Sequence, residues 1–365
     1  MQVSIIVPTY EEAENLGVLV PRVMEELERA GVVGEMIVVD DNSPDDTVSV
    51  CDALAKQYPL RLLVRKEERG LSSAVIHGMR EAHGDIFVVM DADLSHPPEK
   101  VPELIAALDD RQVDFVVGSR YVAGGSTEEG WGIWRWLNSK IATWLARPLT
   151  RCSDPMAGFF AIRRSRFEQA APLGPIGYKI GLELIAKCRC KEIREVPIDF
   201  HNRLHGESKL SLREQLNYLR HLRRLYEFRL GRAARPLQFA LVGASGTLVD
   251  LICFLAFSAM WPFSVARGVA IWVAMTWNFS LNRAMTFSYA KSGPILTQYV
   301  LFCLSCAVGA SANWGGSVGL YSNVGFFQEY KTLAVLCGIL SGVAFNYLLS
   351  SRVVFRRKNA EHYGR

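Results

Sequence analysis

The sequence predicts a doubly wound α/β domain followed by an α-helical transmembrane domain with four spans. Three observations carry this prediction. The chain has 365 residues, more than one ordinary domain. Its charges are uneven, because residues 1–235 hold 32 Lys and Arg and 34 Asp and Glu, whereas residues 236–355 hold five and two. Finally, β-branched runs alternate with amphipathic stretches in the first part, and long apolar runs fill the second.

The first part alternates short apolar strands with amphipathic helices. We expect strands at Val3–Val7, Met36–Val39, Leu60–Val64, Ile86–Met90 and Phe115–Val117, and helices at 12–30, 46–57, 72–82 and 99–109. This order predicts a mostly parallel sheet, and ligands of such sheets bind beyond the carboxyl ends of the strands. Polar residues follow three of the strands, at 8–12, 40–44 and 91–93, so they should converge on one crevice.

Two stretches combine basic and apolar residues in a way that favours a membrane surface. Residues 211–235 contain seven arginines and leucines at helical spacing, and residues 131–149 contain four tryptophans interleaved with Arg135, Lys140 and Arg147. Both patterns are typical of helices that lie on an anionic bilayer. The alternatives are a solvated helix packed on the first domain for 211–235 and a core helix for 131–149.

Four apolar runs, at about 237–260, 263–286, 297–319 and 332–351, are each long enough to cross a bilayer. The N-terminus leads directly into a polar loop and shows no signal peptide, so we place the first domain in the cytoplasm. The inside segments then hold Arg232, Arg235, Arg283, Lys291, Arg352, Arg356, Arg357 and Lys358, and the outside loops hold Arg267 and Lys331. The positive-inside rule therefore predicts four transmembrane helices with both termini cytoplasmic.

The second and fourth apolar runs end alike. The segment from Asn278 to Phe287 matches the segment from Asn346 to Phe355 at an offset of 68 residues. We interpret this as two related helix pairs; chance similarity of apolar segments is the alternative. Asp250 lies near the middle of the first run, where a carboxylate is costly and marks either a function or a pairing inside the bundle.

Several classes of protein are disfavoured. No Gly-x-Gly-x-x-Gly follows the first strand and no Gly-x-x-x-x-Gly-Lys-Ser/Thr occurs, which argues against a dinucleotide oxidoreductase and a P-loop NTPase. A net charge of +4 is too small to predict nucleic-acid binding. The eight cysteines are scattered, and this favours reduced thiols over a metal or redox site.

The Asp91-Ala92-Asp93 sequence is the centre of the predicted chemistry. It follows a strand directly, and Leu94-Ser95-His96-Pro97-Pro98 leads from it into a helix. Two carboxylates on such a turn can bind a divalent cation, Mg²⁺ or Mn²⁺, that also binds the diphosphate of a sugar nucleotide. Most Asp-x-Asp sequences are surface turns, and the position at a strand end is what favours a metal here.

Other polar residues at the strand ends are suited to a nucleoside. Asp40 or Asp41 could accept a hydrogen bond from a ribose hydroxyl or a base edge. The alternative is capping of the next helix, for which Asn42 and Ser43 would suffice. Pro8, Tyr10 and Glu12 follow the first strand, where an aromatic ring and a carboxylate can hold a nucleoside. Packing alone is the alternative for Tyr10.

An ordered set of motifs resembles the family 2 glycosyltransferases, and most closely the polyprenyl-phosphate mannosyltransferases of the dolichol-phosphate-mannose synthase group. The motifs are Pro8-Thr9-Tyr10-Glu11-Glu12, Val39-Asp40-Asp41, Gly70-Leu71, Met90-Asp91-Ala92-Asp93-Leu94-Ser95-His96-Pro97-Pro98, Gly118-Ser119-Arg120-Tyr121 and Gly206-Glu207-Ser208-Lys209-Leu210. The resemblance covers about residues 1–230. Residues 236–355 look like the four-helix membrane domain of some members. The resemblance thus implies a Rossmann-like GT-A domain plus a transmembrane domain.

The resemblance also implies an activity: transfer of mannose from GDP-mannose to dolichyl or polyprenyl phosphate with inversion, using Mg²⁺ or Mn²⁺. The implied donor-binding residues are Pro8, Tyr10, Glu12, Val39, Asp40, Asp41, Asp91, Ala92, Asp93, Arg120 and Lys209. Asp91, Asp93, Arg120 and Lys209 would be catalytic, and Asp91, Asp93 and Ser95 would hold the metal. Some relatives have Gln at the position of Ser95, whose shorter side chain would act through water. Ala157 replaces a Ser of the family pattern, which removes a hydroxyl contact there.

A phosphate acceptor agrees with elementary chemistry. A lipid phosphomonoester has its second pKa near 6, so at neutral pH it is an anionic nucleophile that needs no general base. The site must position the two substrates, offset phosphate repulsion and stabilise the leaving diphosphate. The candidates for binding the acceptor phosphate are Arg120, Arg135, Ser139 and Arg203, and Lys209 could reach either substrate's phosphates. A solvated charge is the alternative for each cation.

We therefore expect three parts: a catalytic domain at 1–210 with an interface helix at 131–149, basic interface helices at 211–235, and a four-helix transmembrane domain at 236–358. The expected partners are GDP-mannose, a polyprenyl phosphate and the lipid bilayer, with no nucleic acid. A UDP-glucose or other hexosyl donor is one alternative, and a transferase fused to a lipid-sugar translocating domain is another. Oligomeric state and polyprenol length are not encoded in any motif.

Overall fold

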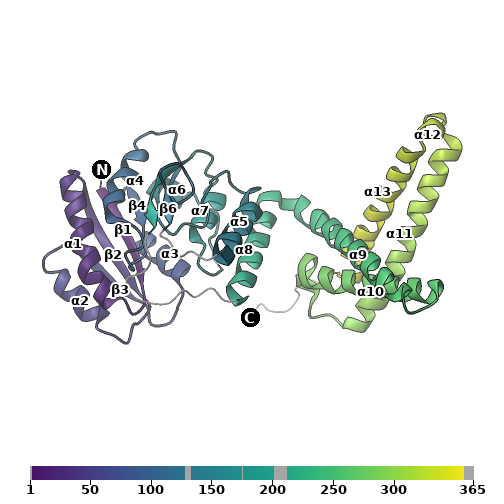
Figure 1. The fold of residues 1–365 in the computed structure, drawn as a ribbon, viewed down its shortest axis with the longest axis horizontal. Helices are drawn as coiled ribbons and strands as arrows, with labels where there is room; N and C mark the ends of the chain where they lie inside the picture. Colours follow the sequence, from purple (N-terminus) through teal and green to yellow (C-terminus); the bar gives the residue numbers. More distant parts are fainter. Residues whose placement is uncertain (1, 128–132, 175, 201–211, 357–365) are drawn as a thin grey trace, which may run out of the picture. The chain divides into compact units, whose positions relative to one another are not determined.

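The computed structural model describes residues 2–127, 133–174, 176–200 and 212–356 (Figure 1). The chain divides into two compact units, Met1–Arg229 and Leu230–Arg365. The predicted residues Arg203 and Lys209 lie outside the described residues, and so does the side chain of Arg135.

The first unit is built on a seven-stranded sheet with the strand order β3-β2-β1-β4-β7-β5-β8. The strands are β1 (Gln2–Thr9), β2 (Val33–Asp40), β3 (Leu60–Val64), β4 (Ile86–Val89), β5 (Phe115–Ser119), β7 (Phe160–Arg163) and β8 (Ile193–Pro197). β7 runs antiparallel to its neighbours β4 and β5, while the other pairs are parallel. The predicted, mostly parallel sheet is therefore confirmed, and its first five strands coincide with the five predicted apolar runs.

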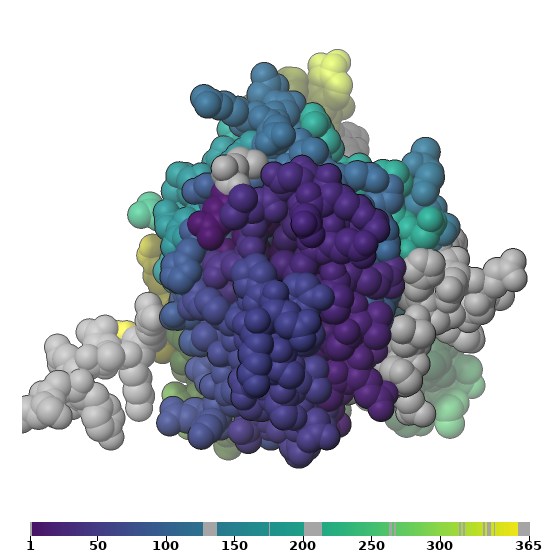
Figure 2. Space-filling view, turned by 90° about the vertical axis from the view of Figure 1, so that its left-hand side faces the viewer, coloured from purple at the N-terminus to yellow at the C-terminus, as the bar shows by residue number. Residues whose placement is uncertain are grey.

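Helices cover both faces of this sheet (Figure 1). They are α1 (Ala13–Arg29), α2 (Thr47–Leu54), α3 (Leu71–Glu81), η1 (Pro98–Lys100), α4 (Val101–Ala107), α6 (Arg164–Glu168) and α7 (Ile180–Lys187). One core joins α1, α2 and α4 to the sheet, and a second core joins α3 and α7 to its other face. α1 and α2 contact each other, and Figure 2 shows their outer surfaces side by side, in purple and indigo.

β1 is an interior strand of the sheet, and its side chains alternate between the two cores. Val3, Ile5 and Val7 point into the core under α1, whereas Ile6 points into the core under α3. All four side chains are fully buried. A strand that is covered on both faces needs apolar residues at successive positions, and this accounts for the continuous apolar run in the sequence.

A third, smaller core joins α5 (Ile133–Ala146) to α8 (Leu212–Leu230) and α7. The hydroxyl of Tyr218 on α8 donates to the carbonyl of Ala142 on α5 at 2.6 Å. Leu222 is buried in this core, whereas Leu216 and Leu219 on the same helix are 47% and 50% exposed. The basic helix thus packs on α5 and α7 and leaves some of its apolar side chains uncovered.

The second unit is helical. It contains α9 (Ala234–Ser258), α10 (Phe263–Leu281), α11 (Ile295–Asn323), the short α12 (Gly325–Glu329) and α13 (Lys331–Leu349), and η2 (Gly231–Ala233) precedes α9. α9 packs on α10, and α11 packs on α13. By length and composition, two helical stretches among the described residues could cross a membrane, Glu214–Ser258 and Ile295–Asn323. The four predicted spans coincide in order with α9, α10, α11 and α13, and their number stays a prediction.

The two helix pairs repeat the same local geometry. A π-helical turn follows α10 at Asn282–Thr286, and another follows α13 at Ser350–Val354. These turns are separated by 68 residues, the offset of the sequence match. They bring Phe287 and Phe355 together, with ring centroids 4.7 Å apart and planes at 15°. The repeated sequence therefore encodes a repeated structure, as expected for related helix pairs.

Each helix pair also has an asparagine packed against a glycine. Asn278 faces Gly246, and Asn346 faces Gly309; a Cβ atom on either glycine would overlap the asparagine side chain. Glycine at these positions therefore lets the two helices approach closely. Both contacts join helices of one pair, so the glycine on the first helix fixes the position of the second.

We predict that Gly309→Ala destabilises the second unit while Gly315→Ala on the same helix does not. A Cβ atom at Gly315 meets nothing within 4 Å, whereas one at Gly309 displaces Asn346. Overpacking of this kind costs about 1–3 kcal/mol. Thermal unfolding of the full-length protein in detergent, followed by tryptophan fluorescence, measures the difference. Equal transition temperatures for the two variants would contradict the close packing described here.

Candidate active site

A cavity of about 1140 Å³ lies at the carboxyl ends of the central strands. The predicted residues that line it are Pro8, Tyr10, Glu12, Asp41, Asp91, Ala92, Asp93, Arg120 and Ser139. Val39 and Asp40 lie behind its wall, where both are fully buried, and Ser95 is almost fully buried as well. The structure thus brings most of the predicted residues together at one place.

The turns at this edge of the sheet have an unusual backbone. Glu11, Asn42 and Leu94 follow β1, β2 and β4, and their φ angles are 59°, 55° and 60°. A left-handed conformation costs a residue with a side chain about 1–2 kcal/mol, less for Asn. Such strain persists where the surrounding contacts hold it, and it clusters at functional sites. The three turns present the polar residues next to them at the cavity edge.

Asp91 and Asp93 end β4 in different environments. The Asp93 carboxylate is buried, and its Oδ1 accepts hydrogen bonds from the backbone N–H of Ser95 at 3.1 Å and from the Ser95 hydroxyl at 2.6 Å. The side chain of Asp91 is 29% exposed. Ser95 therefore fixes the orientation of Asp93, while Asp91 faces the cavity more openly.

His96 holds the backbone of Asp91 through a hydrogen bond. Its Nδ1 accepts a hydrogen bond from the backbone N–H of Asp91 at 3.0 Å, and its ring stacks on Phe159 with centroids 5.1 Å apart. Burial holds the pKa of His96 below its ordinary value, although the charges of Asp91 and Asp93 oppose this shift. The ring is therefore neutral at pH 7 and carries its proton on Nε2, which leaves Nδ1 as the acceptor.

The residues present fit a divalent cation shared with a substrate. A Cβ atom on Gly158 would lie 3.3 and 3.5 Å from the two oxygens of Asp91, so glycine there leaves the space beside this carboxylate open. Among the described residues no group of three or more His, Cys, Asp or Glu side chains could hold a metal. Mg²⁺ is commonly bound by one or two carboxylates together with substrate phosphates and water. Asp91 and Asp93 match that pattern.

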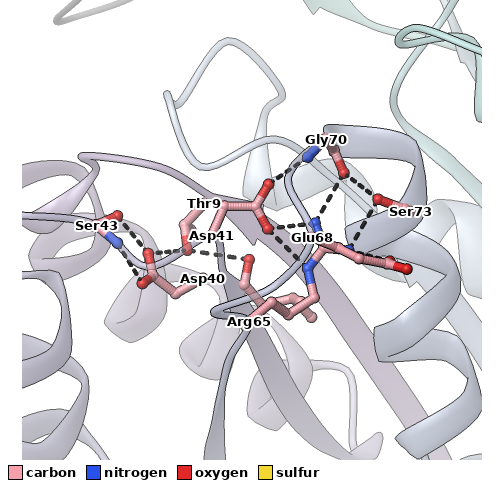
Figure 3. Close-up of polar contacts among 9 residues, drawn as sticks. Thr9, Asp40, Asp41, Ser43, Arg65, Glu68, Gly70 and Ser73 are labelled. Carbon is pink, nitrogen blue, oxygen red and sulfur yellow. Dashed lines mark hydrogen bonds and ion pairs between the residues drawn. The ribbon is translucent and has the colours of Figure 1, made fainter.

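Asp40 and Asp41 both accept hydrogen bonds from their own neighbours (Figure 3). Asp40 accepts from the backbone N–H of Ser43 at 2.9 Å and also from the Ser43 hydroxyl. The hydroxyl of Thr9 lies 3.4 Å from the same carboxylate. Asp40 therefore stabilises the turn after β2 and does not cap the next helix, α2, which begins at Thr47.

Asp41 forms a buried ion pair with Arg65, which follows β3 (Figure 3). Arg65 Nε donates to Asp41 Oδ1 at 2.8 Å, and Arg65 Nη2 donates to it as well. The other oxygen of Asp41 accepts the backbone N–H of Gly70 at 2.7 Å, and Arg65 also donates to the carbonyl of Gly70 and the hydroxyl of Ser73. This network joins the ends of β2 and β3 to the start of α3.

Aromatic and cationic groups lie together at the Tyr10 side of the cavity. The guanidinium of Arg69 lies over the ring of Tyr10, 5.1 Å from its centroid. Glu12 accepts a hydrogen bond from the Asn15 side chain at 2.6 Å. Arg69 and Tyr10 thus offer a stacked cation and ring, a surface suited to a planar base.

Arg120 is held by a buried carboxylate that the sequence motifs did not connect with it. Its Nε and Nη2 donate to the two oxygens of Asp154 at 2.7 and 2.8 Å, and Asp154 is fully buried. Burial opposes the charge of Arg120, but the hydrogen bonds and charge of Asp154 outweigh it and hold the pKa of Arg120 above its ordinary value. The guanidinium also lies over the rings of Tyr121 and Phe200.

Ser139 connects α5 to the same region. Its hydroxyl lies 2.7 Å from the hydroxyl of Tyr121, and the Lys140 ammonium lies 4.2 Å from the centre of the Tyr121 ring. Ser139 and Arg120 both line the cavity. The predicted acceptor residues for which side chains are described therefore share one wall.

Sequence reasoning missed several residues of this site. Arg65, Arg69, Asp154 and Lys179 received no role, and His96 appeared only as part of a motif. Arg69 lies next to the Gly70 motif, and His96 is part of the Asp91 motif. Their positions next to or within these motifs could therefore have identified both as candidate site residues. The partners of Asp41 and Arg120 lie 24 and 34 residues away, and no spacing rule predicts such pairs.

We predict that Arg65→Met strongly destabilises the first unit, because it leaves the Asp41 carboxylate buried without its partner. Removal of one member of a buried ion pair costs about 3–5 kcal/mol. Arg29→Met is the matched control: Arg29 pairs with Glu25 and Glu26 on the surface, where such pairs contribute at most about 1 kcal/mol. Urea unfolding of the two variants measures both effects. Similar small losses for both variants would contradict a structural role for the Asp41–Arg65 pair.

Comparisons with known families agree with this geometry. Residues 4–170 match the model of glycosyl transferase family 2, and residues 238–361 match the GtrA/DPMS transmembrane domain. The mannosyl-3-phosphoglycerate synthase of Rubrobacter xylanophilus has a similar structure, with a TM-score of 0.50 over 64% of this chain and 75% of that chain. Its sequence is 21% identical, so this likeness concerns the fold.

Two curated relatives cover much of the chain. The dolichol-phosphate mannosyltransferase of Pyrococcus furiosus is 39% identical over 360 residues, which is 97% of this chain and 99% of that protein. The protein of the same name from Saccharomyces cerevisiae is 43% identical over 240 residues, 63% of this chain and 89% of that protein. The chain therefore belongs to the dolichol-phosphate mannosyltransferases of glycosyltransferase family 2, and it carries a GtrA/DPMS transmembrane domain.

Proposed function

We propose that this enzyme transfers mannose from GDP-mannose to dolichyl or another polyprenyl phosphate, with inversion, at the cytoplasmic face of a membrane. The observation that carries the proposal is one cavity in which Asp91 and Asp93 lie between a Tyr10–Arg69 surface and the wall of Arg120 and Ser139. The full-length similarity to a named dolichol-phosphate mannosyltransferase supports the same substrates.

The donor would bind along the ends of β1, β2 and β4. Tyr10 and Arg69 offer a surface for the guanine, and Glu12 and Asp41 line the cavity beside them. Pro8, Val39 and Asp40 shape the backbone next to this surface. Ala92 lies between the two carboxylates that face the diphosphate. Lys209 belongs to the same proposal through its motif, although it lies outside the described residues.

Asp91 and Asp93 would hold Mg²⁺ or Mn²⁺, and Ser95 keeps Asp93 in position through its hydroxyl. When bound, a divalent cation supplies positive charge that stabilises the leaving diphosphate. His96 contributes indirectly, because its hydrogen bond to the Asp91 backbone fixes the turn. The neutral imidazole adds no charge that would compete with the metal.

The acceptor would enter from the side of α5 and α8. Ile141, Leu145 and Leu219 line the cavity there, and Ile141 and Leu219 are about half exposed. Such a surface suits a polyprenyl chain, while Arg120, Ser139, Arg135 and Arg203 would bind the phosphate. Trp144 on α5 is 73% exposed and suits a membrane interface.

The reaction is a single displacement. An oxygen of the lipid phosphate forms a bond to the anomeric carbon while the bond from that carbon to the diphosphate oxygen breaks, so the configuration inverts. The acceptor is already an anion at neutral pH and transfers no proton. The contribution of Arg120 is a fixed positive charge, because Asp154 holds its guanidinium in one orientation.

The donor comparison tests this function most sharply. Full-length enzyme in detergent, incubated with a short polyprenyl phosphate and Mn²⁺, should form labelled lipid from GDP-mannose at least about a hundred times faster than from UDP-glucose. Asp93→Ala should abolish product formation, because diphosphate charge is then poorly compensated. Lys56→Met, a substitution at an exposed lysine after α2, is the control for general damage. Preferential use of UDP-glucose would contradict the proposed donor.

A second test concerns topology. We propose four membrane-spanning helices, α9, α10, α11 and α13, with both termini cytoplasmic. A reporter fused after Arg365 should therefore be cytoplasmic, since four spans are an even number and the Arg356-Arg357-Lys358 cluster resists translocation. A matched fusion in the loop after α11 should report the outer side. An external signal from the C-terminal fusion would show that one of the four helices does not span.

A further inference from the structure

Lys179 is a cationic residue of the cavity for which neither the sequence motifs nor the family comparison provides a role. It directly precedes α7, and it lines the cavity together with Asp91 and Arg120. Its chain segment is held on the α3 side, because the Ser72 hydroxyl donates to the carbonyl of Gly177 at 2.6 Å. The same segment is close to α8, since a Cβ atom on Gly177 would lie 3.2 Å from Glu214. Lys179 thus lies where these helices meet.

The hydrogen-bond partner of the Lys179 ammonium group is an uncharged backbone carbonyl. Its Nζ donates to the carbonyl of Met156 at 3.3 Å, and Met156 lies two residues before Gly158, which faces the Asp91 carboxylate. Within the described part of the chain, no carboxylate oxygen lies within ion-pair distance of Nζ. By contrast, Arg120 in the same cavity makes a two-point ion pair with Asp154. A partly buried Lys charge that faces the cavity and has a carbonyl as its partner has capacity to bind an anion.

The electrostatic surroundings agree with this view. Burial and the charge of Arg120 hold the pKa of Lys179 below its ordinary value, against the opposing effect of Asp154, Asp91 and Glu214. A phosphate that bound next to Nζ would offset both effects, because it would supply negative charge to a site with two neighbouring cations. Lysine suits such a contact, since it binds phosphate as a compact point charge with rotatable donors.

We propose that the Lys179 ammonium binds a phosphate oxygen of one of the two substrates beside Asp91, and so positions that substrate for transfer. This inference rests on the proposed function, which supplies two sources of phosphate: the diphosphate of the donor and the monophosphate of the lipid acceptor. Both present the same chemistry to Nζ. A purely structural role would be to hold the segment from Met156 to Gly158 in place.

Two substitutions separate these roles. Lys179→Met keeps the length of the side chain and removes its charge, whereas Lys179→Arg keeps the charge. Lys56→Met again controls for loss of a surface lysine. For each full-length variant, the Kd of GDP in the presence of Mg²⁺ reports the donor side, and the KM of a short polyprenyl phosphate reports the acceptor side. The transition temperature of thermal unfolding reports structural damage.

We expect Lys179→Met to weaken the binding of one of the two substrates by about ten- to a hundredfold, which is the usual contribution of a hydrogen bond to a charged group. Lys179→Arg should recover most of that loss. A shift in the Kd of GDP identifies the donor diphosphate, and a shift in the KM of the polyprenyl phosphate identifies the acceptor. Values within twofold of wild type in both assays would overturn the proposal, provided that wild-type enzyme forms mannosyl lipid. An inactive wild-type enzyme would instead contradict the proposed function.

A second measurement needs no variant and therefore does not depend on folding of the substituted chains. Wild-type enzyme is treated briefly with an amine-acylating reagent, alone, with Mg²⁺ and GDP, or with the short polyprenyl phosphate. Acylation of Lys179 is then quantified by mass spectrometry, with Lys56 as the internal reference. Protection of Lys179 at least about fivefold by one ligand is expected, since occupied amines react slowly. Equal acylation under all three conditions would overturn the proposal.

Discussion

Buried carboxylates at the end of a sheet must accept hydrogen bonds or ion pairs from their neighbours, and this constraint organises the whole site. Asp40 is satisfied by Ser43, Asp41 by Arg65, and Asp154 by Arg120. Each of these contacts also fixes a turn that borders the cavity. Asp91 differs, because its side chain keeps 29% of its surface exposed and faces a glycine. These contacts therefore leave Asp91 accessible to a cation, and Ser95 orients Asp93 beside it.

The same hydrogen bonds determine which charged groups in the cavity remain available to a substrate. Asp154 is the fixed partner of Arg120, so this guanidinium keeps its positive charge in one orientation. His96 is neutral and buried, and it supports Asp91 without adding charge. Lys179 has a carbonyl as its hydrogen-bond partner. A substrate that brings phosphates would thus find a cation at Lys179 and a metal site at Asp91 in the same cavity.

Local patterns in the sequence predicted the sheet and the position of the cavity, because the strand ends carry both signals together. Ile86–Met90 is an apolar run that ends at Asp91, and Val3–Val7 ends at the turn before Tyr10. The antiparallel β7 was missed, since its four residues give no useful periodicity. The partners of Asp41 and Arg120 were also missed, because chain folding and not spacing brings them together. The repeat at offset 68 was visible in sequence, yet its meaning as paired π-helical turns required coordinates.

We propose that Asp91 and Asp93 hold a metal ion jointly with the diphosphate of the donor. Titration of Mn²⁺ into the full-length enzyme, with and without GDP and followed by the electron paramagnetic resonance signal of free Mn²⁺, tests it directly. The protein supplies two carboxylates at this site, so Mn²⁺ alone should bind weakly, and GDP should increase its affinity by about ten- to a hundredfold. An Mn²⁺ affinity that GDP leaves unchanged would contradict a metal site shared by these carboxylates and the diphosphate.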